Sequence, residues 1–182
     1  MPIRNTATRY GSVAQTLHWL VVVLLVIQVT LAKIAEHLPL GPDKIGTLAR
    51  HKSVGITILT LAILRLGWRL YDPPPPQPPM PRWQARAAGF SHATLYALLF
   101  AMPLTGWMMS SASNYPVSWF GLVQLPDLVA PDHSLKELLK EVHETLATIL
   151  IGMASLHLLA ALKHQFLNRD GLLSRMLPWR AR

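Results

Sequence analysis

The sequence predicts an all-α integral membrane protein, an up-and-down bundle of four helices. Its 182 residues are 51% hydrophobic and only 14% charged, which is too apolar for an ordinary soluble domain. Four apolar stretches have the length of about twenty residues that crosses a bilayer core as a helix. Each stretch carries a histidine near one end, and the last carries two. We expect residues 1–182 to form this single membrane domain.

Composition also limits the kinds of binding site that the chain can form. The formal charge of +8 does not indicate nucleic-acid binding, because the basic residues flank apolar spans and form no basic face interleaved with aromatics. Cysteine is absent, which excludes disulfides, thiolate-bound zinc or iron–sulfur sites and covalent haem attachment. Any haem must therefore be held non-covalently.

The first helix is predicted over residues 12–35, with His18 near its start. An apolar run that follows basic residues can be a cleaved signal peptide. This one is too long, however, and no small-residue cleavage site follows Leu31. We therefore expect it to remain in the protein as a membrane-spanning helix.

The second helix is predicted over residues 47–70. It carries His51 near its start and Arg65 and Arg69 near its end. In residues 72–82 proline stands at most positions, which excludes a helix. This segment is predicted to be an extended cytoplasmic connector of polyproline type.

The third helix is predicted over residues 90–111, with His92 near its start. A long loop that contains Trp119 and Phe120 follows it. Asp132 is a candidate N-cap, because its carboxylate can accept from the free backbone amides of a helix that begins there. We expect this segment to be an extramembrane or interfacial start of the fourth helix.

The fourth helix is predicted over residues 138–166 and carries both His143 and His157. Fourteen residues separate these histidines, which is close to four turns, so both project from nearly one face about 21 Å apart along the axis. Nitrogens so far apart cannot share a zinc ion. Small residues on the same face, Ala147 and Ala154, leave room for a flat cofactor.

Lysine and arginine are divided unequally between the two ends of such a bundle. Because these residues are retained in the cytoplasm when they lie in short loops, the richer end is predicted to be cytoplasmic, with both chain termini, in a bacterial inner membrane. That end holds Arg4, Arg9, Arg65, Arg69, Arg82, Arg86, Lys163, Arg169, Arg175, Arg180 and Arg182, against Asp72 and Asp170. The other end holds Lys33, Lys44, Arg50, Lys52, Lys136 and Lys140, against Glu36, Asp43, Asp127, Asp132, Glu137, Glu141 and Glu144.

The bundle sorts five histidines into two layers. His51 and His143 lie toward the outer side and form one pair. In the inner layer His157 is fixed by sharing its helix with His143, and its partner is either His18 or His92. Two layers of imidazoles on facing helices are what two stacked haems require, because each iron takes two axial nitrogens. We therefore predict two non-covalent b-type haems.

Arg65 lies fourteen residues after His51 and so returns to the same helix face at the depth of the inner layer. Its guanidinium is a candidate partner for a haem propionate, or alternatively a snorkelling charge that sets topology. The three remaining histidines are predicted to be exposed to solvent or lipid headgroups. They are His37, His133 and His164.

Short motifs surround these histidines along nearly the whole chain. They occupy residues 16–20, 51–55, 91–96 and 143–147, with further matches at 119–121 and 175–178. In this combination the sequence resembles the bacterial cytochrome b561 family. The resemblance implies two b-type haems, one held by His18 and His157 and the other by His51 and His143. His92 then has a polar role near the cytoplasmic boundary or belongs to a quinone or proton site.

The resemblance also implies a function. One branch of the family oxidises superoxide at the periplasmic face and reduces ubiquinone, so we expect an oxidoreductase of this type. Local positive charge would attract superoxide, from Arg50, Lys52, Lys136 or Lys140. The alternative is an electron-conduit subunit docked to a dehydrogenase, a hydrogenase or a periplasmic cytochrome. A third hypothesis is a haem-free structural or transport protein whose histidines are incidental.

Overall fold

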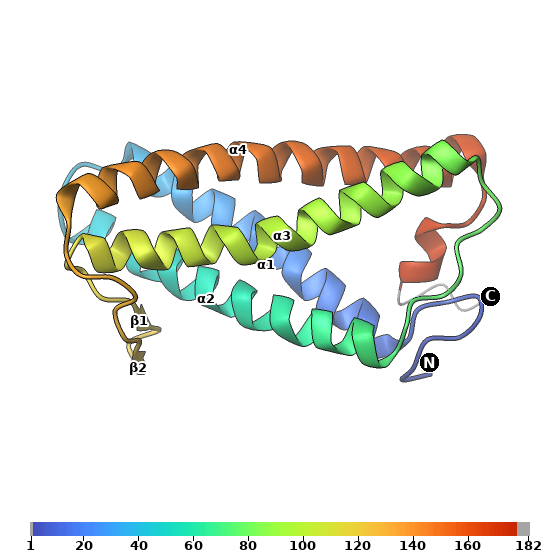
Figure 1. The fold of residues 1–182 in the computed structure, drawn as a ribbon, viewed down its shortest axis with the longest axis horizontal. Helices are drawn as coiled ribbons and strands as arrows, with labels where there is room; N and C mark the ends of the chain where they lie inside the picture. The colour runs from blue at the N-terminus through green and yellow to red at the C-terminus, as the bar shows by residue number, and fades with distance from the viewer. Residues whose placement is uncertain (1, 178–182) are drawn as a thin grey trace.

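Four long helices make up most of the computed structural model, which describes residues 2–177 (Figure 1). Successive helices run in opposite directions (Figure 1). The structure therefore confirms the predicted all-α, up-and-down architecture. The helices are α1 (Ser12–His37), α2 (Pro42–Tyr71), α3 (Arg82–Ala112) and α4 (His133–Lys163).

All four helices are long and apolar enough to cross a membrane. They contain 26 to 31 residues, which corresponds to about 39–46 Å at a rise of about 1.5 Å per residue. Because the hydrocarbon core is about 30 Å thick, the helix ends extend into the polar regions on both sides.

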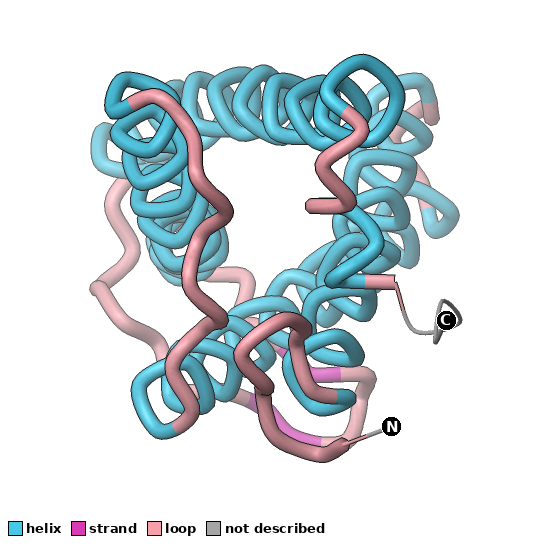
Figure 2. The backbone as a smooth tube through the Cα atoms, turned by 90° about the vertical axis from the view of Figure 1, so that its right-hand side faces the viewer, coloured by secondary structure: helices cyan, strands magenta, loops and turns pink. Residues whose placement is uncertain are grey.

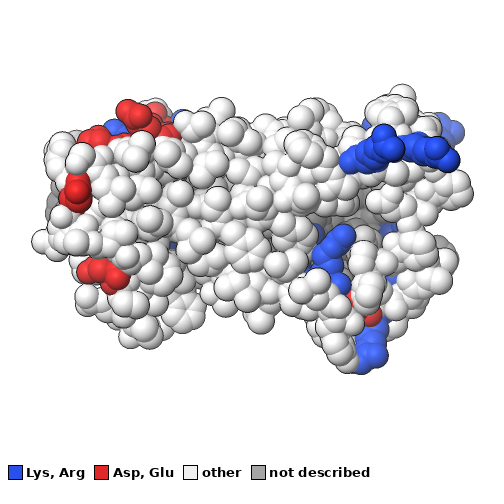
Figure 3. Space-filling view, in the orientation of Figure 1, with Lys and Arg blue, Asp and Glu red and all other residues white. Residues whose placement is uncertain are grey.

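The two ends of the bundle differ in charge (Figure 3). We call the end at which α1 and α3 begin and α2 and α4 end the basic end, and the opposite end the acidic end. Figure 3 shows Lys and Arg gathered at the basic end and Asp and Glu at the acidic end. Arg180 and Arg182, which the sequence assigns to the basic side, and Pro178 of the closing motif lie outside the described residues.

Three helices begin earlier than the apolar runs that predict them. α2 starts at Pro42, a residue whose fixed φ suits the first helical turn, and α3 starts at Arg82, directly after the extended connector. α4 starts at His133, where the Asp132 carboxylate accepts the backbone N–H of Leu135 at 3.0 Å. This confirms the predicted cap. The helices extend past their apolar stretches because their polar first turns are also helical, although they lie outside the bilayer core.

The apolar core occupies the middle of the bundle. Val21 of α1, Leu99 of α3 and three residues of α2 form one buried cluster, and Ala62 within it is fully buried. Only Leu139 and Leu150 are buried on α4. The inner face of α4 is otherwise half-exposed, so α4 packs less tightly against the bundle than α2 does.

Backbone carbonyls of the last described residues close the basic end. A π-helical turn, η1 (His164–Asn168), and a 3-10 helix, η2 (Leu173–Met176), follow α4. The Trp19 indole donates to the Met176 carbonyl at 2.9 Å, and the Arg9 guanidinium donates to the Leu177 carbonyl at 2.8 Å. The start of α1 is thus held against the chain segment that follows α4.

The structure corrects the prediction for His164. Its side chain is only 15% exposed, and Nδ1 lies 2.5 Å from Oδ2 of Asp170. The sequence favoured an exposed residue, because nothing in it shows that the chain reverses after η1 through Arg169, whose φ is 53°. His37 and His133 are exposed, as predicted.

Between α3 and α4 the chain forms a small hairpin that the sequence did not predict. Its strands are β1 (Ser118–Trp119) and β2 (Val123–Gln124), and they pair antiparallel. The hairpin lies beside α2 on the outside of the bundle, both in the side view (Figure 1) and in the view along the bundle (Figure 2).

Candidate functional site

The acidic end brings one predicted pair of histidines together. His51 of α2 and His143 of α4 face each other with ring centroids 6.4 Å apart and an interplanar angle of 73°. α3 approaches the pair closely, because a Cβ added to Gly106 would lie 3.1 Å from Cε1 of His143. A side chain larger than hydrogen at this position would push the His143 ring away.

A neighbouring hydroxyl fixes the protonation of the His143 ring. Oγ1 of Thr105 donates to the Met102 carbonyl at 2.9 Å and lies 3.0 Å from Nδ1 of His143. Because the hydroxyl hydrogen is already used, its oxygen accepts from Nδ1–H. Nε2 of His143 therefore carries the free lone pair, which is the form in which histidine binds a metal.

His51 shows the same preference through another partner. The amide Nε2 of Gln28, on α1, lies 3.1 Å from Nε2 of His51. An amide NH₂ can only donate, so Nε2 of His51 is the acceptor and its lone pair is occupied by the Gln28 amide, which must turn away before this nitrogen can bind a metal. Nδ1 of His51 is buried and has no hydrogen-bond partner among the described residues.

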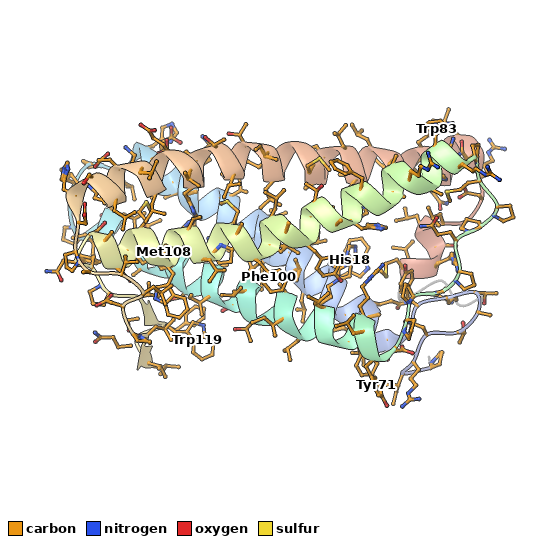
Figure 4. The ribbon with its side chains drawn as sticks, in the orientation of Figure 1. His18, Tyr71, Trp83, Phe100, Met108 and Trp119 are labelled. Atoms are coloured by element: carbon orange, nitrogen blue, oxygen red, sulfur yellow. The ribbon has the colours of Figure 1, made fainter. Side chains whose placement is uncertain are left out.

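The second group of histidines lies nearer the basic end. His18 of α1 and His157 of α4 have centroids 6.5 Å apart and an interplanar angle of 73°. His92 of α3 also reaches His157, with a centroid distance of 5.4 Å. Figure 4 shows the His18 ring directed into the space between the helices.

Both predicted pairs have the spacing that one iron between two imidazoles requires. A metal–imidazole bond is about 2 Å long and the ring centre lies about 1 Å beyond the nitrogen, so the two ring centres lie about 6 Å apart. The distances of 6.4 and 6.5 Å fit this value, whereas 5.4 Å for His92 and His157 is short. The geometry thus favours His18 over His92 as the partner of His157.

Arg65 adds a positive charge to the basic-end group. Its guanidinium lies 5.4 Å from the centre of the Tyr96 ring, and it is within electrostatic range of His18 and His157. Among the described residues no carboxylate lies within ion-pairing distance of it. Arg65 is half-buried, so its charge is available to an anionic group inside the bundle.

The inner face of α4 between its two histidines carries two small side chains. Ala147 and Ala154 are half-exposed although they lie on the same face as the paired histidines, and Leu150 between them is buried. Leu150 thus fills the layer between the two pairs, and the alanines add little side-chain volume near each pair.

Sequence reasoning missed two residues of this arrangement. Thr105 and Gln28 contact the acidic-end pair, but a single threonine or glutamine on an apolar helix carries no signal of its own.

Comparisons with known proteins place the chain in a family. The family model described as prokaryotic cytochrome b561 matches residues 9–179. The chain is 33% identical to "Cytochrome b561 homolog 2" of Escherichia coli (strain K12), over 97% of this chain and 95% of the relative. It is 31% identical to "Cytochrome b561 homolog 1" of the same organism, over 94% and 98%.

A third relative carries a functional name. "Probable superoxide oxidase CybB" of Yersinia pestis is 30% identical, over 93% of this chain and 96% of the relative. With four helices able to span a membrane, the match to the family model over nearly the full length identifies the chain as an inner-membrane protein of a family that implies b-type haem. The chain belongs to the prokaryotic cytochrome b561 family.

Proposed function

We propose that this protein is a diheme b-type cytochrome that transfers electrons across the inner membrane, from superoxide to ubiquinone. The observation that carries the proposal is the presence of two imidazole pairs, 6.4 and 6.5 Å between ring centres, displaced from each other along one bundle. A family relative named a probable superoxide oxidase supports the choice of electron donor.

Four histidines would hold the two haems. His51 and His143 would ligate one iron, and His18 and His157 the other. Arg65 would pair with a propionate at the basic end, where a carboxylate would satisfy its charge. Bound haem supplies one-electron redox chemistry, and the protein contributes ligation, spacing and electrostatics.

The overall reaction balances with two superoxide ions for each quinone. Each superoxide loses one electron and becomes O₂, and the quinone takes two electrons and two protons to become the quinol. The protein's part at the donor side is to attract an anion to the acidic end.

Arg50 and Lys52 are the best placed cations for this task. They flank His51 in the sequence and have no carboxylate within ion-pairing distance among the described residues, whereas Lys136 is paired with Glu137 at 2.9 Å. The acidic end as a whole carries more acids than bases, so the attraction of superoxide must be local.

We place the quinone at the basic end, inside the bundle near His92. This histidine is left over when His18 pairs with His157, and its ring lies 5.4 Å from that of His157. An imidazole at this position can hydrogen-bond a quinone carbonyl. The excess of Lys and Arg at this end supports the proposal that it faces the cytoplasm, as do both chain termini.

The test combines haem quantitation with rapid mixing. Purified, haem-loaded protein should contain two haems per polypeptide by pyridine hemochrome analysis. Superoxide should reduce its haem absorption bands, and added ubiquinone should reoxidise them. Two haems without reduction by superoxide would favour the conduit alternative, and co-purification of a dehydrogenase or a periplasmic cytochrome would then identify the donor. A colourless, haem-free preparation would reject both the proposed superoxide-to-ubiquinone activity and the conduit alternative.

A further inference from the structure

The hairpin β1–β2 and the turn that joins its strands present apolar side chains to the outside of the bundle. Phe120 is 53% exposed, Leu122 78% and Val123 51%. The surrounding loop, residues 113–126, contains no charged residue. A loop of this length in water would normally carry charges, so its composition calls for an apolar environment.

The turn itself holds an unusual residue. The backbone N–H of Leu122 donates to the Trp119 carbonyl at 3.0 Å, and both central residues have positive φ, 50° at Phe120 and 74° at Gly121. This is a type I′ turn, whose first central position is normally occupied by Asn, Asp or Gly. A phenylalanine there is conformationally unfavourable, and although its ring contacts that of Trp119 at a centroid distance of 5.7 Å, half of the residue remains exposed.

The hairpin is fixed to the outer side of α2. Oγ of Ser53 accepts the backbone N–H of Phe120 at 2.9 Å, and it lies 3.2 Å from the Ser118 carbonyl. The Trp119 indole donates to Oγ1 of Thr57 at 3.1 Å. Ser53 is 2% exposed, so these bonds are shielded from water and hold the hairpin in one position.

This attachment sets the level of the hairpin along the bundle. Ser53 and Thr57 stand in residues 53–64 of α2, which contain no charged residue, whereas Arg50 and Lys52 precede them. The polar-to-apolar boundary of α2 therefore coincides with the hairpin. Figures 1 and 2 show the hairpin projecting sideways from the bundle and not beyond its end.

We propose that the 118–124 hairpin is a membrane anchor that inserts Phe120 and Leu122 into the lipid interface at the acidic end. Trp119 lies within it and Tyr115 shortly before it, and such aromatics are typical of the interfacial level. The occupant of this surface is lipid and not a soluble protein, because the hairpin faces sideways at the level where the apolar part of α2 begins. The proposal does not depend on haem or on the electron donor.

The absence of cysteine from the chain makes a direct test possible, since each introduced cysteine is the only thiol. Leu122→Cys would carry a nitroxide label in phosphatidylethanolamine–phosphatidylglycerol vesicles. Ile63→Cys on α2, 55% exposed within the apolar segment, gives the lipid reference. His133→Cys, exposed at the start of α4, gives the aqueous reference. All three positions are exposed, and unchanged elution as a single species confirms folding.

Power saturation then reports collisions of the label with O₂, which concentrates in lipid, and with a water-soluble nickel chelate. For Leu122 we expect severalfold fewer nickel collisions than at His133 and severalfold more O₂ collisions. Nickel collisions equal to those at His133 would place the hairpin in water and overturn the proposal. Low collision rates with both reagents would show that protein, such as a second copy of the chain, covers the hairpin, and would also overturn it.

Discussion

The hydroxyl oxygen of Thr105 lies 3.0 Å from Nδ1 of His143 while its hydrogen is directed to the Met102 carbonyl at 2.9 Å. A residue of α3 thereby decides which nitrogen of a histidine on α4 is free. Such second contacts orient a ligating imidazole and raise its basicity.

Thr105→Val should weaken the acidic-end haem because the Nδ1–H of His143 loses its acceptor. Loss of such a contact typically costs about 10–100-fold in metal affinity. Haem retained after dialysis against apomyoglobin measures the effect. Thr105→Ser keeps the hydroxyl and should bind haem like the natural protein. Equal loss in both variants would show that packing at this position matters and the hydrogen bond does not.

His143→Ala and His157→Ala should each remove one haem of the two. Each variant deletes a ligand from one pair and leaves the other pair, about 21 Å away along α4, intact. Pyridine hemochrome analysis should give one haem per polypeptide in both variants, with different reduced-minus-oxidised spectra. Identical spectra would contradict two separate sites.

His18→Ala and His92→Ala distinguish the two candidate partners of His157. Because 6.5 Å fits an intervening iron and 5.4 Å is short, His18→Ala should lose the basic-end haem and His92→Ala should keep both haems. The measurement is haem content with low-temperature spectra. If His92→Ala loses the haem and His18→Ala retains it, the pairing is wrong.

Arg65→Gln should lower the reduction potential of the basic-end haem. Removing a nearby positive charge favours the oxidised iron, which carries more positive charge than the reduced iron. Potentiometric titration of the haem bands measures the shift. Arg69→Gln, which removes a charge 6.0 Å from the same Tyr96 ring, is the control. Equal shifts of the reduction potential in both variants would show that the potential responds to the overall positive charge at this end, and not to a specific contact of Arg65.

The contact between Asp170 and His164 should make stability depend on pH. Burial alone would raise the pKa of the Asp170 carboxyl, but hydrogen bonds from His164 and the Leu172 backbone outweigh it and hold the pKa below its ordinary value of 3.8. The stabilisation is therefore fully present above about pH 4 and is lost as the pH falls through the lowered pKa.

Thermal unfolding of Asp170→Asn beside the natural protein measures this contribution in detergent. The natural protein should be the more stable at pH 7 and at pH 5, and the difference should shrink as the pH falls below about 4. If the difference in stability between the two proteins stays constant down to pH 3, the effect comes from side-chain packing and not from the charge of Asp170.

The four membrane spans and the sorting of the histidines into two layers could be predicted, because both depend only on position along a helix. Hydropathy indicates the four spans, and alternating helix direction then gives the depths of His51 and His143. Contacts that depend on rotation of one helix against another could not be predicted. Thr105 reaches His143 only because α3 approaches α4 closely at Gly106.

Two local reversals of the chain could not be predicted from the sequence either. The positive φ of Arg169 turns Asp170 back onto His164, and the positive φ of Phe120 forms a turn that its sequence disfavours. Neither residue is of the type that normally adopts this conformation. In both places contacts made by the rest of the protein stabilise a backbone shape that the local sequence does not prefer.

The basic-end pair joins the first long helix to the last. His18 and His157 can meet only after α4 has been inserted and has found α1, whereas each helix hairpin can form earlier by itself. Acquisition of a cofactor between them would mark the completion of assembly. The haem absorbance of a membrane preparation would then report how much of the newly made chain has completed this assembly.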